Sequence, residues 1–126
     1  MREILFRGKT FDNEWVEGFY VNQFGAHEIY CLDDSDYKAC HIYPSTVGQY
    51  TGLIDKNGKK IFEGDIVVVP LSGKPAKGIV EYFKTDICGF AVITQPQYSN
   101  YVLQKNYAYE VIGNIYDNPE LLEVEK

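Results

Sequence analysis

This 126-residue sequence contains three cysteines and two histidines. These are the residue types that most readily bind metal ions or take part in nucleophilic catalysis. His27 precedes Cys31, and Cys40 is followed at once by His41, so a site with mixed nitrogen and sulfur ligands has to be considered. Adjacent residues of a strand point to opposite faces, which keeps Cys40 and His41 from one ion. The same argument disfavours a Cys–His nucleophile, although Cys31 with His41 across two strands stays open. We predict no metal, no cofactor, and cysteines (Cys88 included) that remain thiols.

Two carboxylates, Glu63 and Asp65, flank Gly64. Such a pair could bind a divalent cation or share a proton. Turn chemistry is the simpler interpretation, in which Asp65 accepts backbone N–H groups and Glu63 is solvated. The sequence has no glycine-rich phosphate loop and no recognisable catalytic motif, so we expect a protein that is not an enzyme.

Aromatic residues are abundant, with eleven Tyr, seven Phe and one Trp. Many lie in the second half of the chain. They are either the core and rim of an aromatic-rich barrel or an exposed face for protein contacts, where Tyr concentrates binding energy. The candidate interaction surface consists of Tyr82, Phe83, Phe90, Tyr98, Tyr101 and Tyr107.

The net charge of −6 restricts the partners. An acidic surface disfavours phosphate backbones and suits a basic protein, such as a DNA-binding protein. Neither a secretory leader nor an apolar run long enough to span a membrane is evident, so we expect a cytoplasmic protein.

Period-2 alternation and turn signals dominate the chain and predict an all-β, mainly antiparallel domain over residues 1–126. Pro44 should end the fourth strand, because proline cannot donate to a ladder. The first half contains strands over Arg2–Arg7, Glu14–Asn22, His27–Leu32, Tyr37–Tyr43 and Val47–Leu53. The second half contains strands over Lys59–Phe62, Ile66–Val69, Gly78–Phe83, Gly89–Thr94, Tyr101–Leu103 and Tyr109–Tyr116.

The segment from Asn57 to Val69 carries the clearest local signals. Asn57-Gly58 between apolar runs predicts a type I′ hairpin turn, with positive φ at both residues. Gly64-Asp65 is a sharp turn into Ile66–Val69, which is apolar on both faces and should be a central strand. A second glycine-led strand at Gly78 makes the pattern similar to small SH3-like barrels.

A short helix is predicted at the C-terminal end. Asn118 suits the N-cap, Pro119 the first helical position and Glu120 the first turn. Leu121 and Leu122 give it an apolar side with which to lie back on the sheet. The expected architecture is thus a partly SH3-like barrel or sandwich with a short C-terminal helix.

Three blocks of the sequence resemble the YopX family of phage and prophage proteins, and the resemblance covers nearly the whole chain. These blocks are 1–18, beginning Met1-Arg2-Glu3-Ile4-Leu5-Phe6-Arg7, then 42–67, with Asp55-Lys56-Asn57-Gly58, and 110–122, with Ile112-Gly113-Asn114-Ile115-Tyr116. The resemblance implies a small protein encoded by a bacteriophage or prophage and acting in the bacterial cytoplasm. It implies no activity and no catalytic residue.

Three hypotheses for function follow. The first is an accessory protein that binds through protein–protein contacts. The second is a nucleic-acid-binding barrel, which the charge disfavours, and the third is an enzyme whose carboxylate site is not recognisable. We also expect a homo-oligomer, most simply a twofold dimer, because strand edges and double-faced apolar strands must be covered.

Overall fold

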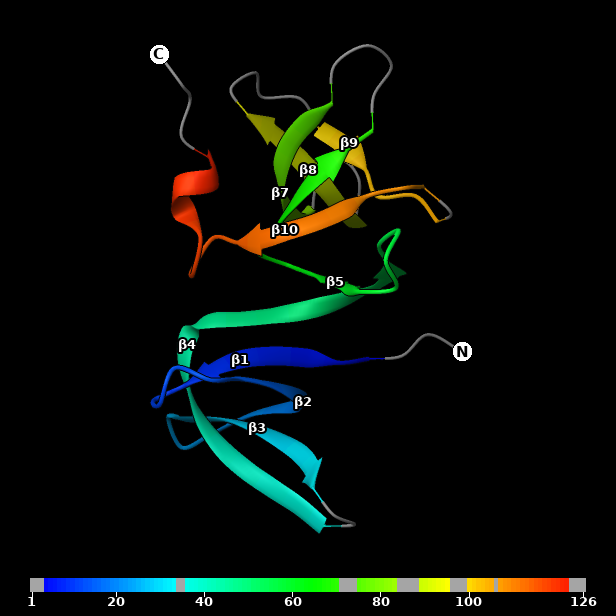
Figure 1. Ribbon diagram of the computed structural model, residues 1–126. Helices are drawn as coiled ribbons and strands as arrows, with labels where there is room; N and C mark the ends of the chain where they lie inside the picture. Colours follow the sequence, from blue (N-terminus) through cyan, green and yellow to red (C-terminus); the bar gives the residue numbers. More distant parts are fainter. Residues whose placement is uncertain are drawn as a thin grey trace. The chain divides into compact units, whose positions relative to one another are not determined.

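The computed structural model describes residues 4–33, 36–70, 75–83, 89–95, 100–105 and 107–122. Over these residues the structure consists of mainly antiparallel sheets, which confirms the all-β class. The part of the chain that is described contains no helix with the length and apolar character that a membrane crossing requires. The elements are β1 (Phe6–Thr10), β2 (Trp15–Gln23), β3 (Ala26–Asp33), β4 (Asp36–Ile54), β5 (Lys60–Phe62), β6 (Asp65–Val69), β7 (Ala76–Phe83), β8 (Gly89–Gln95), β9 (Asn100–Val102), β10 (Glu110–Asn114) and η1 (Pro119–Leu122), shown in Figure 1.

The chain divides into two compact units, Met1–Gly52 and Leu53–Lys126, which we call unit 1 and unit 2. The sequence predicts one domain over residues 1–126, and this stays a prediction, since two compact units can belong to one domain. Strand β4 runs from unit 1 to the first residues of unit 2.

Unit 1 is built from β1, β2, β3 and most of β4. Within unit 1 each of these strands pairs with two others, since β4 pairs with β3 in its first part and with β1 in its second, and β4 also pairs with β5 of unit 2. Ile29 and Ile42 are fully buried between the strands. At Gly18, a β-carbon would lie 2.1 Å from the carbonyl oxygen of Tyr30, so the close approach of β2 and β3 requires glycine there.

Strand β4 continues through Pro44, so the predicted strand end at this residue is wrong. Tyr43 pairs with Lys9 and Gly48 with Arg7, which leaves residues 44–47 of β4 opposite one residue of β1. The Thr46 hydroxyl bridges this bulge: it accepts the Lys9 N–H at 2.9 Å and donates to the Tyr43 carbonyl at 2.6 Å. A bulge bends its strand, and Figure 1 shows β4 changing direction along its length.

Unit 2 contains an antiparallel sheet in the order β10-β6-β7-β8-β9. As predicted, the apolar run at 66–69 is an interior strand, β6, flanked by β10 and β7. Among the described residues no pairing joins β9 to β10, and a closed barrel is therefore not established. The core consists of Ile61, Val67, Val69, Val80, Val92 and Tyr109.

The predicted C-terminal helix is a single 3-10 turn, η1, over the residues described. It lies against β10 as expected, because a β-carbon on Gly113 would come within 2.9 Å of the Leu121 side chain. Lys77 also donates to the Leu121 carbonyl at 2.7 Å. The Asn118 side chain does not cap η1 as predicted. Its oxygen accepts the N–H of Asn114, which precedes η1, at 3.3 Å.

Candidate functional site

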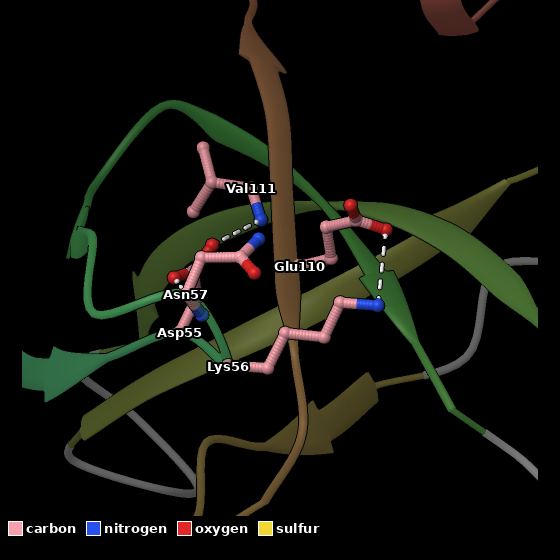
Figure 2. A network of polar contacts seen from close by, with 5 residues as sticks. All are labelled: Asp55, Lys56, Asn57, Glu110 and Val111. Atoms are coloured by element: carbon pink, nitrogen blue, oxygen red, sulfur yellow. Dashed lines mark hydrogen bonds and ion pairs between the residues drawn. The ribbon is translucent and has the colours of Figure 1, made fainter.

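A polar network in unit 2 surrounds Asp55, which directly follows the last residue of β4. Its side chain is only 4% exposed. One carboxylate oxygen accepts the N–H groups of Asn57 and Lys59, both at 2.9 Å. The other accepts the Val111 N–H, also at 2.9 Å, from β10 (Figure 2). Asp55 therefore fixes its own turn and ties that turn to a strand far along the sequence.

Electrostatics and further contacts reinforce this network. Burial alone would raise the pKa of Asp55, but the N–H groups of Val111, Lys59 and Asn57, with the charge of Lys59, together lower it below its usual value. The Lys56 N–H donates to the Tyr109 carbonyl at 2.8 Å. Lys56 Nζ lies 3.6 Å from a Glu110 carboxylate oxygen (Figure 2), but this pair is exposed and adds little. The network has the character of a structural clasp, because both Asp55 carboxylate oxygens accept backbone N–H groups of the fold.

The turn residues singled out from the sequence have mainly structural positions. Gly58 has φ of +81°, whereas Asn57 is not among the described residues with positive φ, so the turn is not type I′. The Gly58 N–H donates to the Asp55 carbonyl at 3.0 Å, and the Asp55 N–H to the Lys59 carbonyl at 2.7 Å. This is the three-residue hairpin loop, a type I turn followed by glycine.

Gly64 and Asp65 form the second turn of this segment. Gly64 has φ of +88°, and its N–H and carbonyl bond to Val80 and Ile115 respectively. Asp65 is fully buried and accepts the Phe62 N–H at 2.8 Å. Glu63 is partly exposed. Over the described residues, no group of three or more His, Cys, Asp or Glu side chains could hold a metal ion.

The aromatic residues of the candidate surface differ in exposure. Tyr82 is 43% exposed and packs edge-on against Phe90, which is 7% exposed. Tyr107 is exposed and packs against the buried Tyr109. Tyr101 is half-buried. Tyr98 and the side chain of Phe83 lie outside the described residues.

Phe24 in unit 1 is the most exposed large apolar residue of the described chain, at 99%. It sits at the tip of the β2–β3 hairpin, where Gln23 pairs with Ala26. Phe24 and Gly25 have φ of +54° and +81°, as in a type I′ turn. Positive φ is an uncommon backbone conformation for a bulky residue. The sequence pattern did not single out Phe24, because exposure of one aromatic residue is not visible in composition or periodicity.

A groove of about 550 Å³ opens in unit 1 between the β1–β2 turn and the β3–β4 hairpin. It contains Cys31 and Cys40, whose sulfur atoms lie 3.9 Å apart. Both are partly exposed rather than fully buried. His41 stacks on Phe11 at the groove, and its Nε2 lies 3.8 Å from a Glu28 oxygen. The sequence left Cys31 with His41 open as a nucleophile pair, but the structure brings the two cysteines together.

Comparison with known proteins gives a family and a fold. The family model described as "YopX protein" matches residues 5–123. The crystal structure of protein EF1440 from Enterococcus faecalis is similar at 24% sequence identity, with a TM-score of 0.58, over 98% of this chain and 100% of that chain. This likeness shows the fold alone, and no curated protein matches the chain. Since the family model matches nearly all of the sequence, the chain belongs to the YopX family.

Proposed function

We propose that this YopX-family protein is a non-enzymatic phage or prophage accessory protein that binds a protein partner in the bacterial cytoplasm. The observation that carries the proposal is Phe24. A phenyl ring that is almost wholly in water, on a backbone with positive φ, gives the fold no packing and strains its turn. Local rules are broken in this way at functional positions. Insertion of the ring into an apolar pocket of a partner gives it the burial that the fold does not provide.

The surroundings of Phe24 support contact with a protein. Asn22 and Gln23, which precede Phe24 in the sequence, are exposed, uncharged polar residues, and a polar rim around an aromatic anchor is the usual anatomy of a protein interface. The tip also lies at the end of two paired strands, β2 and β3, which hold it in place. The net charge of −6 favours a host or phage protein with a basic surface, and it disfavours the nucleic-acid alternative.

The aromatic surface of unit 2 supports a second contact, with another copy of the chain. Tyr82 and Tyr107 are exposed there, and β9 and β10 are the edges of the sheet among the pairings described. The unpaired N–H and C=O groups of an edge strand can pair with a strand of another chain. We therefore propose a twofold dimer through this surface.

Capture from a lysate of phage-infected bacteria tests the proposal with substitutions that keep the fold. Phe24→Asn places the sequence Asn-Gly in a turn with positive φ at both residues, which this sequence favours. The substitution should therefore stabilise the protein by up to about 1 kcal/mol. It should also abolish capture of the partner, because the ring is removed. Phe11→Ser is the matched control. Phe11 is 59% exposed at the other tight turn of unit 1, where it packs against Tyr43.

Loss of one defined protein with Phe24→Asn, and its retention with Phe11→Ser, is the expected result. Capture of the same proteins by the wild type and Phe24→Asn would refute the role of the hairpin tip. If Tyr82→Ser loses the captured protein and Phe24→Asn retains it, the binding surface lies on unit 2 rather than at the hairpin tip.

A further inference from the structure

The cysteine pair in the groove of unit 1 is placed by strand register. In the β3–β4 pairing Cys31 is opposite Lys38, and Ile29 is opposite Cys40. Side chains two residues apart on a strand share a face, so the two thiols lie on one side of the sheet and diagonally across it. Their sulfur atoms are in van der Waals contact at 3.9 Å. The Cys31 thiol also lies 3.5 Å from the Lys38 carbonyl oxygen.

Access to the pair is provided by the groove. Its volume of about 550 Å³ exceeds that of a small reagent, and both cysteines are partly exposed. The third cysteine, Cys88, lies outside the described residues. Two thiols that touch each other and open to solvent can react together. The residues around them include Thr10, Val16 and Ala39.

We propose that Cys31 and Cys40 form a reversible intramolecular disulfide by exchange with a low-molecular-weight disulfide such as oxidised glutathione. A thiolate of one cysteine attacks a sulfur of glutathione disulfide, which gives a protein–glutathione mixed disulfide and releases one glutathione thiolate. The second cysteine loses its proton to solvent and attacks the protein sulfur of the mixed disulfide. The protein disulfide forms and a second glutathione leaves, so two protein thiols are oxidised and one glutathione disulfide is reduced.

The geometry favours the second step and also keeps the bond reversible. The attacking thiol is held next to its target, whereas a second glutathione must arrive from solution. A disulfide requires sulfur atoms about 2.05 Å apart, so the thiols must approach by roughly 2 Å. Diagonal pairs have a longer backbone separation than opposite pairs. The bond should therefore draw β3 and β4 together and be reduced easily by an excess of glutathione thiol.

Glutathione redox buffers and intact-mass measurement test the proposal on the full chain carrying Cys88→Ser, which leaves only the two thiols of interest. The expected product has lost the mass of two hydrogen atoms and carries no glutathionyl group. Adding Cys31→Ser or Cys40→Ser should instead trap a protein with one glutathionyl group. The disulfide should form at least about tenfold faster in buffer than in concentrated urea, where the juxtaposition is lost.

Three outcomes would overturn the inference: a product with two glutathionyl groups, a disulfide-linked dimer, or equal rates in buffer and urea. If Cys88→Ser fails to fold, peptide mapping of the oxidised wild type decides the matter, because the predicted linkage joins the peptides that contain Cys31 and Cys40. Since no partner protein takes part, failure here leaves the proposed protein binding untouched.

Discussion

Removing the Asp55 carboxylate should destabilise the protein strongly. Hydrogen bonds to charged groups contribute about 1.5–3 kcal/mol each, and Asp55 accepts three of them while almost fully buried. The N–H groups of Asn57 and Lys59 belong to exposed residues, so water can replace part of their loss. The Val111 N–H, on a half-buried strand, is harder to rehydrate. We expect Asp55→Ala to lower the free energy of unfolding by about 3–5 kcal/mol.

Asp55→Asn provides a finer measurement of the same network. The amide keeps one acceptor oxygen, which can serve the Asn57 and Lys59 donors of the turn. Its NH₂ group then faces the Val111 N–H, and two donors meet. The expected loss is about 1–3 kcal/mol, the effect of one unsatisfied group.

Urea unfolding at pH 7 measures both variants, and the midpoint gives the change in stability where the slope is unaltered. Asp12→Ala is the matched control, because Asp12 is an exposed aspartate in the turn between β1 and β2. It should change the free energy of unfolding by no more than about 0.5 kcal/mol. Equal midpoints for Asp55→Ala and Asp12→Ala would refute the clasp.

The pH dependence provides an independent check. The pKa of Asp55 is lowered in the folded protein, so the stabilisation is complete above its unfolded pKa of about 3.9. It is lost as the pH falls below about 4 towards the lower, folded pKa. A protonated aspartate resembles asparagine, and the stabilities of the wild type and Asp55→Asn should therefore converge in acid. A constant difference between pH 7 and pH 3 would contradict the assignment.

Four other outcomes are expected. Gly58→Val should destabilise by at least about 1 kcal/mol because of its φ of +81°, whereas Gly58→Asn should unfold near the wild-type midpoint; equal midpoints for the two would contradict the backbone explanation. Gly18→Ala should destabilise by more than about 2 kcal/mol in the same assay, since its β-carbon would lie 2.1 Å from the Tyr30 carbonyl oxygen; a wild-type midpoint would show that β2 and β3 do not approach so closely. Light scattering at micromolar concentration should give about twice 14.4 kDa, and a mass of 14.4 kDa at every concentration would refute the dimer. Fluorescence anisotropy should detect no submicromolar binding to RNA or DNA at physiological salt, and such binding would favour the barrel alternative.

Local pattern predicted most of the strands, because most of them alternate between apolar and polar residues and have a turn at their ends. It located the interior strand β6 from Ile66–Val69, but it placed the first strand at Arg2–Arg7, whereas β1 is Phe6–Thr10. It failed where a distant contact decides the outcome. Pro44 does not end β4, because the Thr46 hydroxyl bonds to Lys9, 37 residues earlier in the chain. No local rule contains that contact.

The two glycine turns show why turn type is also hard to predict. Asn57-Gly58 has the preferred type I′ sequence, yet the Asp55 side chain accepts the Asn57 N–H and only Gly58 has positive φ. Phe24-Gly25, without the preferred asparagine, has positive φ at both residues.

The candidate sites depended on register, which the sequence left open. Cys31 and Cys40 meet only because Asp33 pairs with Asp36. A loop of another length would have moved one of them to a different neighbour. The aromatic surface was predicted from composition alone, without knowledge of strand register. Composition did not distinguish the exposed Tyr82 from the buried Phe90 that packs against it.

The bond between Asp55 and Val111 also has a consequence for the order of folding. It joins residues 56 positions apart, whereas the β7–β8 hairpin joins near neighbours. Contacts that close long loops form late, since the entropy of closure must be met before the contact contributes. We expect hairpins such as β7–β8 to form first and β10 to dock last. Weakening the clasp should then hasten unfolding and leave the folding rate almost unchanged, so that Asp55 governs the lifetime of the native state rather than the speed of reaching it.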